Sequence, residues 1–450
     1  MKLTSLLTKS FCLLTFFSLL LAGCQDPKLD EIILEEQSSN LQTYVDQPVN
    51  IESTNESPIQ GQYIVQLNTE NPSDEFQELS SFHPSNVEKS ISKRKEKTVD
   101  AKSQLTDEAY SADLRPIAKK LLKKEGINTA GIREVFQHAA AGFVVEMTAT
   151  DAKKLESNPN VELVEQDALI AMNFEPLIRT PFIPSDTDEA SRQKPYGVDM
   201  MGGSVDFTKN ERWANTFVWI IDTGIDMDHP DLHVRADYSV DFSKDNNVED
   251  VLGHGTHVAG IIAAKDNGIG VSGIAAGAQV VSVKIINDKG QGQKSDFLRA
   301  IEYVVRYSLP GDVINISLGG SNSNSYKSAI RKAIAALQLS GLYVTIAAGN
   351  DGIDVKNITP ANIDGFRIYT VGAIDWDKQY TDYSNFGTSV DFAAPGHGIL
   401  STYLDGKYAF MSGTSMAAPH IAGVMVLEGL NFQHTGLVNS KGGILPTIRH

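Results

Sequence analysis

Cysteine is nearly absent from this chain of 450 residues. Its two cysteines, Cys12 and Cys24, lie within the first two dozen residues, so the rest of the chain offers no disulfide, thiolate metal site or cysteine nucleophile. Basic residues are also scarce, because 39 Lys and Arg against 56 Asp and Glu leave a net charge of −17. Phosphate binding needs a basic face, so we expect no nucleic-acid partner.

Long apolar runs are confined to the N-terminus, where residues 11–22 follow Lys2 and Lys9. This run is too short for a normal transmembrane helix and is typical of a signal peptide over residues 1–23. It ends in Leu-Ala-Gly-Cys24, which resembles the lipobox of bacterial lipoproteins. We therefore expect lipidation of Cys24 and an extracytoplasmic protein, either anchored to a bacterial membrane or released from it by a later cut in the chain. A plain secretory signal is the alternative.

Residues 24–58 are polar and acidic, which predicts a solvated tether without a core. Residues 59–172 predict a small α+β domain, and residues 173–195 are rich in proline, threonine and aspartate, as in a linker with a processing region. Residues 83–130, rich in Lys, Arg and Glu, are interpreted as an insertion that is part helical and part disordered. Strands and a helix of the small domain are expected at 62–67, 142–147, 152–156 and 161–167.

From residue 196 to 450, continuous apolar segments alternate with helical stretches. This alternation predicts an α/β domain whose mostly parallel sheet is covered by helices on both faces. The strands are expected at 217–221, 280–286, 313–317, 342–347 and 368–371. The tail after residue 430 shows no clear amphipathic period, so the sequence predicts no helix or strand for this last part of the domain.

Four short motifs carry residues suited to chemistry. Asp222 ends an apolar strand, His254 lies in Gly-His-Gly-Thr-His before an apolar helix, and Ser415 lies in Gly-Thr-Ser-Met-Ala-Ala-Pro-His at another helix start. Asn350 follows a strand that ends in Ala-Ala-Gly. Taken singly, each has an ordinary structural interpretation, as a turn or capping residue. His257 shares a helix with His254, but the spacing does not match a zinc metalloprotease helix, and we interpret it as a packed histidine.

Together, and in the order Asp, His, Asn, Ser, the motifs resemble the signature blocks of the subtilase family of serine proteases over residues 196–428. Residues 59–172 resemble, more loosely, the ferredoxin-like inhibitor propeptide of that family. The resemblance implies a serine endopeptidase with Asp222, His254 and Ser415 as its catalytic triad and Asn350 as an oxyanion donor.

The same resemblance implies further roles. Ser317, Leu318 and Gly319 would offer main-chain groups to an extended polypeptide substrate. The propeptide would act as an intramolecular inhibitor that the enzyme removes by its own triad. Catalysis would need no cofactor. Asp391 has two interpretations: it binds a structural Ca²⁺, as in some relatives, or it only caps a turn.

Two other functions stay open at this point. A subtilase-fold surface lipoprotein with a silent site would act as a binding module. A metal-dependent hydrolase would resist serine-directed reagents and lose its activity in a chelator.

Overall fold

The computed structural model describes residues 57–83, 113–171, 195–209, 215–319 and 329–450. The predicted signal peptide, Cys24 and nearly all of the acidic tether lie outside the described residues. So do residues 84–112 and almost the whole predicted linker. Within the described ranges, no helix combines the length and apolar character that crossing a bilayer requires.

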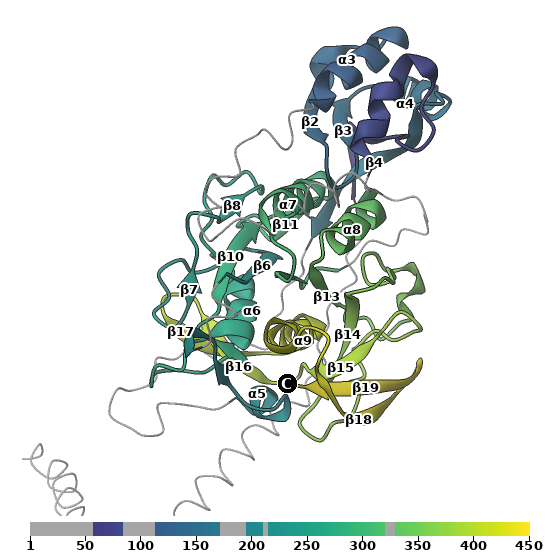
Figure 1. Ribbon diagram of the computed structural model, residues 1–450. Coiled ribbons are helices and arrows are strands. Elements are labelled where there is room, and N and C mark those ends of the chain that lie inside the picture. Colours follow the sequence, from purple (N-terminus) through teal and green to yellow (C-terminus); the bar gives the residue numbers. More distant parts are fainter. Residues whose placement is uncertain (1–56, 84–112, 172–194, 210–214, 320–328) are drawn as a thin grey trace, which may run out of the picture. The chain divides into compact units, whose positions relative to one another are not determined.

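The N-terminal domain is an antiparallel sheet packed against helices (Figure 1). Its elements, in chain order, are β1 (Ser57–Leu67), a 3₁₀ segment (Asp74–Phe82), α3 (Leu114–Lys124), a short 3₁₀ turn (Thr129–Gly131), β2 (Ile132–Phe136), β3 (Gly142–Glu146), α4 (Ala149–Glu156) and β4 (Val161–Ala171). The strand order β4-β1-β3-β2 with two crossing helices is the ferredoxin-like βαββαβ arrangement. The expected propeptide fold is therefore confirmed.

Helix α3 lies inside the segment 83–130 that the sequence suggested to be an insertion. Its apolar side chains Leu114, Leu121 and Leu122 are completely buried in the same cluster as Phe143 of β3. The helical part of the prediction is confirmed, but α3 belongs to the domain core rather than to an appended insertion. The many charged residues of this segment concealed the apolar stripe on one face of the helix.

The C-terminal domain contains a parallel sheet with the order β15-β14-β13-β12-β6-β10-β7, and β8 also pairs with β10. The strands are β6 (Phe217–Asp222), β7 (His233–Val234), β8 (Val240–Asp241), β10 (Gln279–Lys284), β12 (Val313–Ile316), β13 (Tyr343–Ala347), β14 (Ile368–Ile374) and β15 (Phe392–Pro395). All five predicted strands are present, and β15 is an additional strand at one edge.

Helices cover both faces of this sheet, because alternate residues of each strand point to opposite sides. Trp219 and Ile221 of β6 belong to the apolar cluster that contains α7 (Lys294–Tyr307) and α8 (Ala329–Leu339). Val218 and Ile220 belong to the cluster that contains α6 (His254–Ala263) and α9 (Thr414–Glu428). The predicted α/β class is confirmed.

Short elements complete the C-terminal domain. They are α5 (Tyr196–Met200), β5 (Val205–Asp206), a 3₁₀ turn (Phe207–Lys209), β9 (Ala275–Ala276), β11 (Gln291–Gln293), a second 3₁₀ turn (Val355–Asn357) and the hairpin of β16 (Ile399–Tyr403) with β17 (Lys407–Met411). β5 pairs with β9 in a two-stranded sheet, whereas β11 adds to the sheet of the N-terminal domain.

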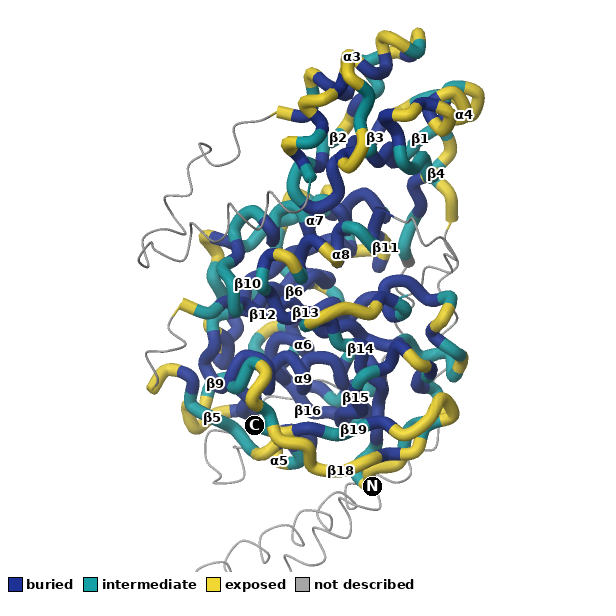
Figure 2. Tube along the Cα trace, turned by 45° about the vertical axis from the view of Figure 1, so that its right-hand side comes forward, coloured by how far each residue is buried: buried dark blue, intermediate teal, exposed yellow. Residues whose placement is uncertain are grey.

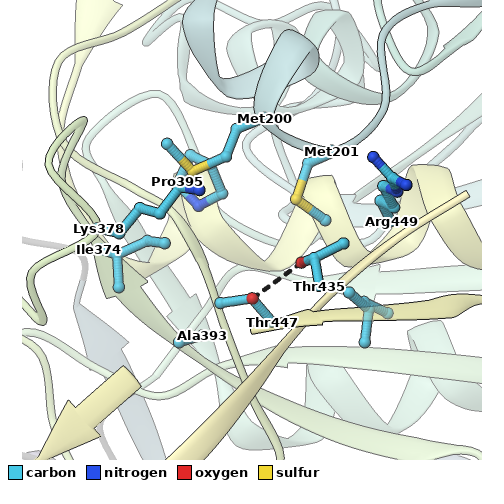
Figure 3. Close-up of a pocket in the computed structure, with 10 residues that line it drawn as sticks. Met200, Met201, Ile374, Lys378, Ala393, Pro395, Thr435, Thr447 and Arg449 are labelled. Atoms are coloured by element: carbon cyan, nitrogen blue, oxygen red, sulfur yellow. Dashed lines mark hydrogen bonds between the residues drawn. The ribbon is translucent and has the colours of Figure 1, made fainter. Parts of the chain in front are cut away.

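The chain after α9 forms a hairpin of β18 (Gln433–Ser440) and β19 (Gly443–Arg449), an ordered element that the sequence did not predict. Val438, Leu445 and Ile448 are buried, while most of β18 is exposed (Figure 2). The hairpin, α5 and β15 border a cavity of about 190 Å³ (Figure 3). Thr435 and Thr447 lie in its wall with their hydroxyl oxygens 2.9 Å apart.

Candidate active site

Asp222 is the last residue of β6 and is fully buried at the carboxyl edge of the sheet. Its Oδ1 accepts a hydrogen bond from the amide of Thr223 and lies 2.7 Å from Nδ1 of His254. An ionised carboxylate can only accept, so the proton of the neutral imidazole must be on Nδ1. Nε2 of His254 is then the proton acceptor of the ring.

His254 begins α6, and the glycines around it allow the close approach of neighbouring segments. Gly253 has φ 87°, and a Cβ there would lie 2.1 Å from the ring of Tyr403. A Cβ on Gly255 would lie 2.1 Å from the carbonyl oxygen of Gly224. Glycine is therefore required on both sides of the histidine.

Asp250 organises the start of α6, a role that the sequence analysis missed. One carboxylate oxygen accepts from Thr223 Oγ1 at 2.9 Å and Gly253 N at 2.9 Å, and the other from Thr256 N at 3.0 Å and Oγ1 at 2.7 Å. Gly253, the N-cap position, has no side chain to satisfy the first amides of the helix. Asp250 therefore caps α6 from outside the helix. Because it also bonds Thr223, it links the start of α6, where His254 lies, to the end of β6.

Replacing Asp250 with alanine should lower the free energy of unfolding by about 3–5 kcal/mol, because several buried donors would lose a charged acceptor. Urea denaturation of a proteolytically inactive background would measure the loss. Asp237→Ala is the matched control, since Asp237 is exposed and pairs with Arg235 at the surface, where such a pair contributes about 0–1 kcal/mol. Equal losses in the two variants would contradict this role of Asp250.

Ser415 is the second residue of α9 and contacts the end of β12. Its Oγ donates to the carbonyl oxygen of Ser317 at 3.1 Å, and Ser317 Oγ donates to the carbonyl oxygen of Ser415 at 2.9 Å. Pro419 would be the ordinary helical partner of that Ser415 carbonyl but has no N–H to donate. Pro419 thus lies beyond the first turn of α9, where a proline is ordinarily tolerated, and Ser317 replaces the missing bond.

Asn350 lies three residues beyond the end of β13, and its carboxamide orientation is fixed. Its Oδ1 accepts from the amide of Thr414 at 2.7 Å and from Thr414 Oγ1 at 3.0 Å. Thr414 Oγ1 in turn accepts from Gly349 N at 2.9 Å. A Cβ placed on Gly413 would lie 3.4 Å from Nδ2 of Asn350. Nδ2 is therefore presented as a donor beside the N-terminus of α9.

β11 is a further edge of the C-terminal domain that the sequence analysis missed. Gln291, Gly292 and Gln293 pair antiparallel with Ala171, Ile170 and Leu169 at the end of β4. Such main-chain pairing is the way an extended peptide adds to a sheet edge. Of the predicted substrate-binding residues, Ser317 lies beside Ser415. Pairing of a substrate along Ser317, Leu318 and Gly319 stays a prediction.

His257 is completely buried, and its Nε2 lies 3.0 Å from the carbonyl oxygens of both Ile399 and Ala409. Burial lowers the pKa of His257 to about 3, so the ring is neutral at physiological pH. The prediction of a packed, hydrogen-bonded histidine is confirmed.

Comparison with known proteins identifies both domains. Residues 214–429 match the Subtilase family (Peptidase S8), and residues 62–172 match Peptidase inhibitor I9. The chain is 35% identical to Subtilisin E of Bacillus subtilis (strain 168) over 312 residues, covering 68% of this chain and 75% of that one. It is 34% identical to Proteinase R of Parengyodontium album over 303 residues, covering 64% and 70%.

Among solved structures, a cold-adapted subtilisin-like serine proteinase is 33% identical, with a TM-score of 0.42 over 47% of this chain and 74% of that one. The chain therefore belongs to the subtilase family, as a serine endopeptidase preceded by an inhibitor-type propeptide domain.

Proposed function

We propose that Asp222, His254 and Ser415 form the catalytic triad with which this chain hydrolyses peptide bonds. The observation that carries the proposal is the 2.7 Å contact between His254 Nδ1 and buried Asp222, which leaves Nε2 as a base. Ser415 lies at the N-terminus of α9, whose core cluster is shared with α6. Because a carboxylate beside the ring stabilises its charged form, His254 is suited to take up a proton.

The reaction proceeds through a covalent acyl-enzyme. Ser415 Oγ attacks the scissile carbonyl carbon while its proton passes to Nε2 of His254. The hydroxyl has a single proton, which it donates to Ser317 O in this structure, so the hydroxyl must turn toward His254 before attack. The same imidazolium then protonates the leaving amine, and water hydrolyses the acyl-enzyme by the reverse transfer.

Asn350 and the start of α9 provide the donors for the tetrahedral oxyanion. Nδ2 of Asn350 and the amide of Ser415 are the two groups, and the positive end of the α9 dipole adds to them. Their value for catalysis depends on orientation, which Thr414 fixes before substrate arrives.

Labelling with a fluorophosphonate tests this proposal. The reagent should modify Ser415 in the mature protein, and Ser415→Ala should abolish the modification. A silent binding module would not react with the reagent. A metal-dependent hydrolase would remain active after treatment and lose its activity in a chelator.

The propeptide is proposed to inhibit the enzyme until the triad removes it. The end of β4 occupies the β11 edge, and the chain continues from there toward the processing region. Elsewhere in the interface, half-buried Glu302 of α7 accepts from the amides of Gln137, His138 and Ala139 and lies 2.5 Å from His138 Nδ1. Burial raises the pKa of Glu302, but the hydrogen bond and charge of His138 together with the backbone amides outweigh it, and the net pKa is lowered.

A structural Ca²⁺ has two candidate positions. Carboxylate oxygens of Asp226, Asp228 and Glu249 lie within 4.8 Å of one another, a donor set of the hard oxygen type that Ca²⁺ prefers. At Asp391, named from the sequence, one oxygen accepts from the Thr370 amide and burial raises the pKa to about 7. Burial also raises the pKa of Asp226 to about 6.

The stabilisation by Ca²⁺ should increase between about pH 5 and about pH 8. Both folded-state pKa values exceed the ordinary value of 3.8, so the protonated carboxyls stabilise the fold at low pH. That contribution is lost as the pH rises through about 6 for Asp226 and about 7 for Asp391, where a cation can replace the proton. Thermal unfolding with Ca²⁺ or a chelator would measure this, and Asp228→Asn against Asp391→Asn would identify the site. An equal gain at both pH values would contradict the coupling.

We also propose that Cys24 carries a lipid that anchors the precursor outside the cytoplasm of a bacterium. The Leu-Ala-Gly-Cys24 sequence after an apolar run supports it. Mass spectrometry of the N-terminus before and after maturation would test it. An unmodified Cys24 in the precursor would overturn the proposal, and a mature chain that begins after β4 would mean release from the anchor.

A further inference from the structure

Three carboxylates of β4 contact the C-terminal domain. Glu162 pairs with Lys332, and Glu165 lies 3.8 Å from Lys294 Nζ. Glu165 also accepts from the amide of Ala329 at 3.2 Å. The third, Asp167, accepts from the amide of Ser295 at 3.1 Å. β4 thus presents a line of acidic groups to one face of the protease domain.

One of these contacts is at a helix N-terminus, because Ser295 lies in the first turn of α7. Amides in a first turn have no partner within their helix, and the helix dipole favours an anion there. Asp167 is fully buried at this point, and its second oxygen accepts from Gln62 Nε2 at 2.5 Å. The contact of Glu165 is with Ala329, the first described residue of α8.

Lys294 of α7 and Lys332 of α8 supply positive charge to this face, in a chain of net charge −17. The Lys294 side chain is only 6% exposed, and partial burial lowers the pKa of Lys332. The neighbouring acidic group of the protease domain is Asp296, which faces Arg299 at 3.4 Å. Each of these groups contacts a carboxylate of β4, and we call Lys294, Lys332 and the amides of Ser295 and Ala329 the acid-binding face.

We propose that the acid-binding face is an extended substrate site of the mature enzyme, which selects polypeptides with acidic residues upstream of the cleaved bond. The inference rests on the proposed peptidase function and specifies its substrate class. The propeptide itself gives the register: Leu169 is the first residue paired with β11, and Asp167, Glu165 and Glu162 precede it by two, four and seven residues. A substrate paired in the same way would place its carboxylates on the same donors.

Two fluorogenic peptides of equal length test the inference on the enzyme matured from the full chain. One contains the sequence of residues 161–171 followed by an apolar cleaved segment, and its twin has glutamine or asparagine at Glu162, Glu165 and Asp167. At low salt, kcat/KM should be about tenfold higher for the acidic peptide, and the ratio should shrink at about 0.5 M salt. In Lys294→Met/Lys332→Met the ratio should fall toward one. Lys441→Met, which removes an exposed lysine from the β18–β19 turn, should retain the ratio.

The outcomes separate this inference from the proposed function. Equal kcat/KM for the two peptides in the unmodified enzyme would overturn the acid-binding face and leave the peptidase intact. Failure to cleave either peptide would overturn the proposed function itself. If the double lysine variant does not fold, the peptide ratio and its salt dependence in the unmodified enzyme still decide the question.

Discussion

Ser415→Ala is expected to leave the full-length chain as an uncleaved precursor and to lower kcat on a peptide substrate about 10⁶-fold, the loss known for the equivalent change in subtilisin, a relative of this chain. The precursor should accumulate because the substitution removes the proposed attacking oxygen. His254 and Asp222 would still be paired, but the base would have no hydroxyl to deprotonate. Residual turnover would reflect the oxyanion donors and substrate binding alone.

The measurement is the mass of the purified chain after expression in a protease-free host, together with kcat on a short peptide. Ser440→Ala, which changes a serine of the C-terminal hairpin, is the matched control and should mature normally. Maturation of Ser415→Ala at the wild-type rate would show that another protease processes the chain. Retained activity would end the case for Ser415 as the nucleophile.

Asn350→Leu should lower kcat by about 10²–10³ with little change in KM, because an oxyanion donor contributes mainly in the transition state. That range is the one known for subtilisin. Thr414→Val should produce a smaller loss of about tenfold, since it removes one of the two bonds to Asn350 Oδ1 while the Thr414 amide continues to hold it.

Steady-state kinetics on one peptide would resolve the two parameters, and Asn439→Leu on exposed β18 is the control for the change in residue type. A rise in KM with unchanged kcat in Asn350→Leu would assign the carboxamide to ground-state binding. An equal loss in both variants would mean that orientation through Thr414, rather than the donor alone, decides the rate.

Much of the central sheet and the candidate site could be predicted because the features that mark them lie within short stretches of sequence. A buried parallel strand is a continuous apolar segment, as in β6 and β12. Asp222, His254 and Ser415 each lie next to glycines or a helix start that mark a special backbone position. The carboxyl ends of parallel strands lie at one edge of the sheet, which is where Asp222 meets His254 and where Ser415 meets Ser317 after β12.

The remainder depended on contacts between distant segments. Asp250 looks like any acidic loop residue until the fold brings Thr223, Thr256 and the amides of Leu252 and Gly253 to its carboxylate. An aspartate just before a predicted helix is nevertheless a capping signal that could have been used. β11 has only three residues and becomes a strand only by pairing with β4. The hairpin after α9 buries few side chains, so its period-two pattern is too weak to recognise.

The proline in α9 has a mechanical consequence. A helix with an ordinary residue at position 419 would bond the carbonyl of Ser415, the proposed nucleophile, within the helix, whereas here the Ser317 hydroxyl donates to it. Ser317 begins the segment where we expect a substrate strand to pair, so a bound substrate should restrict the motion of the Ser415 backbone as well. We therefore expect long substrates to turn over faster than short esters with the same leaving group.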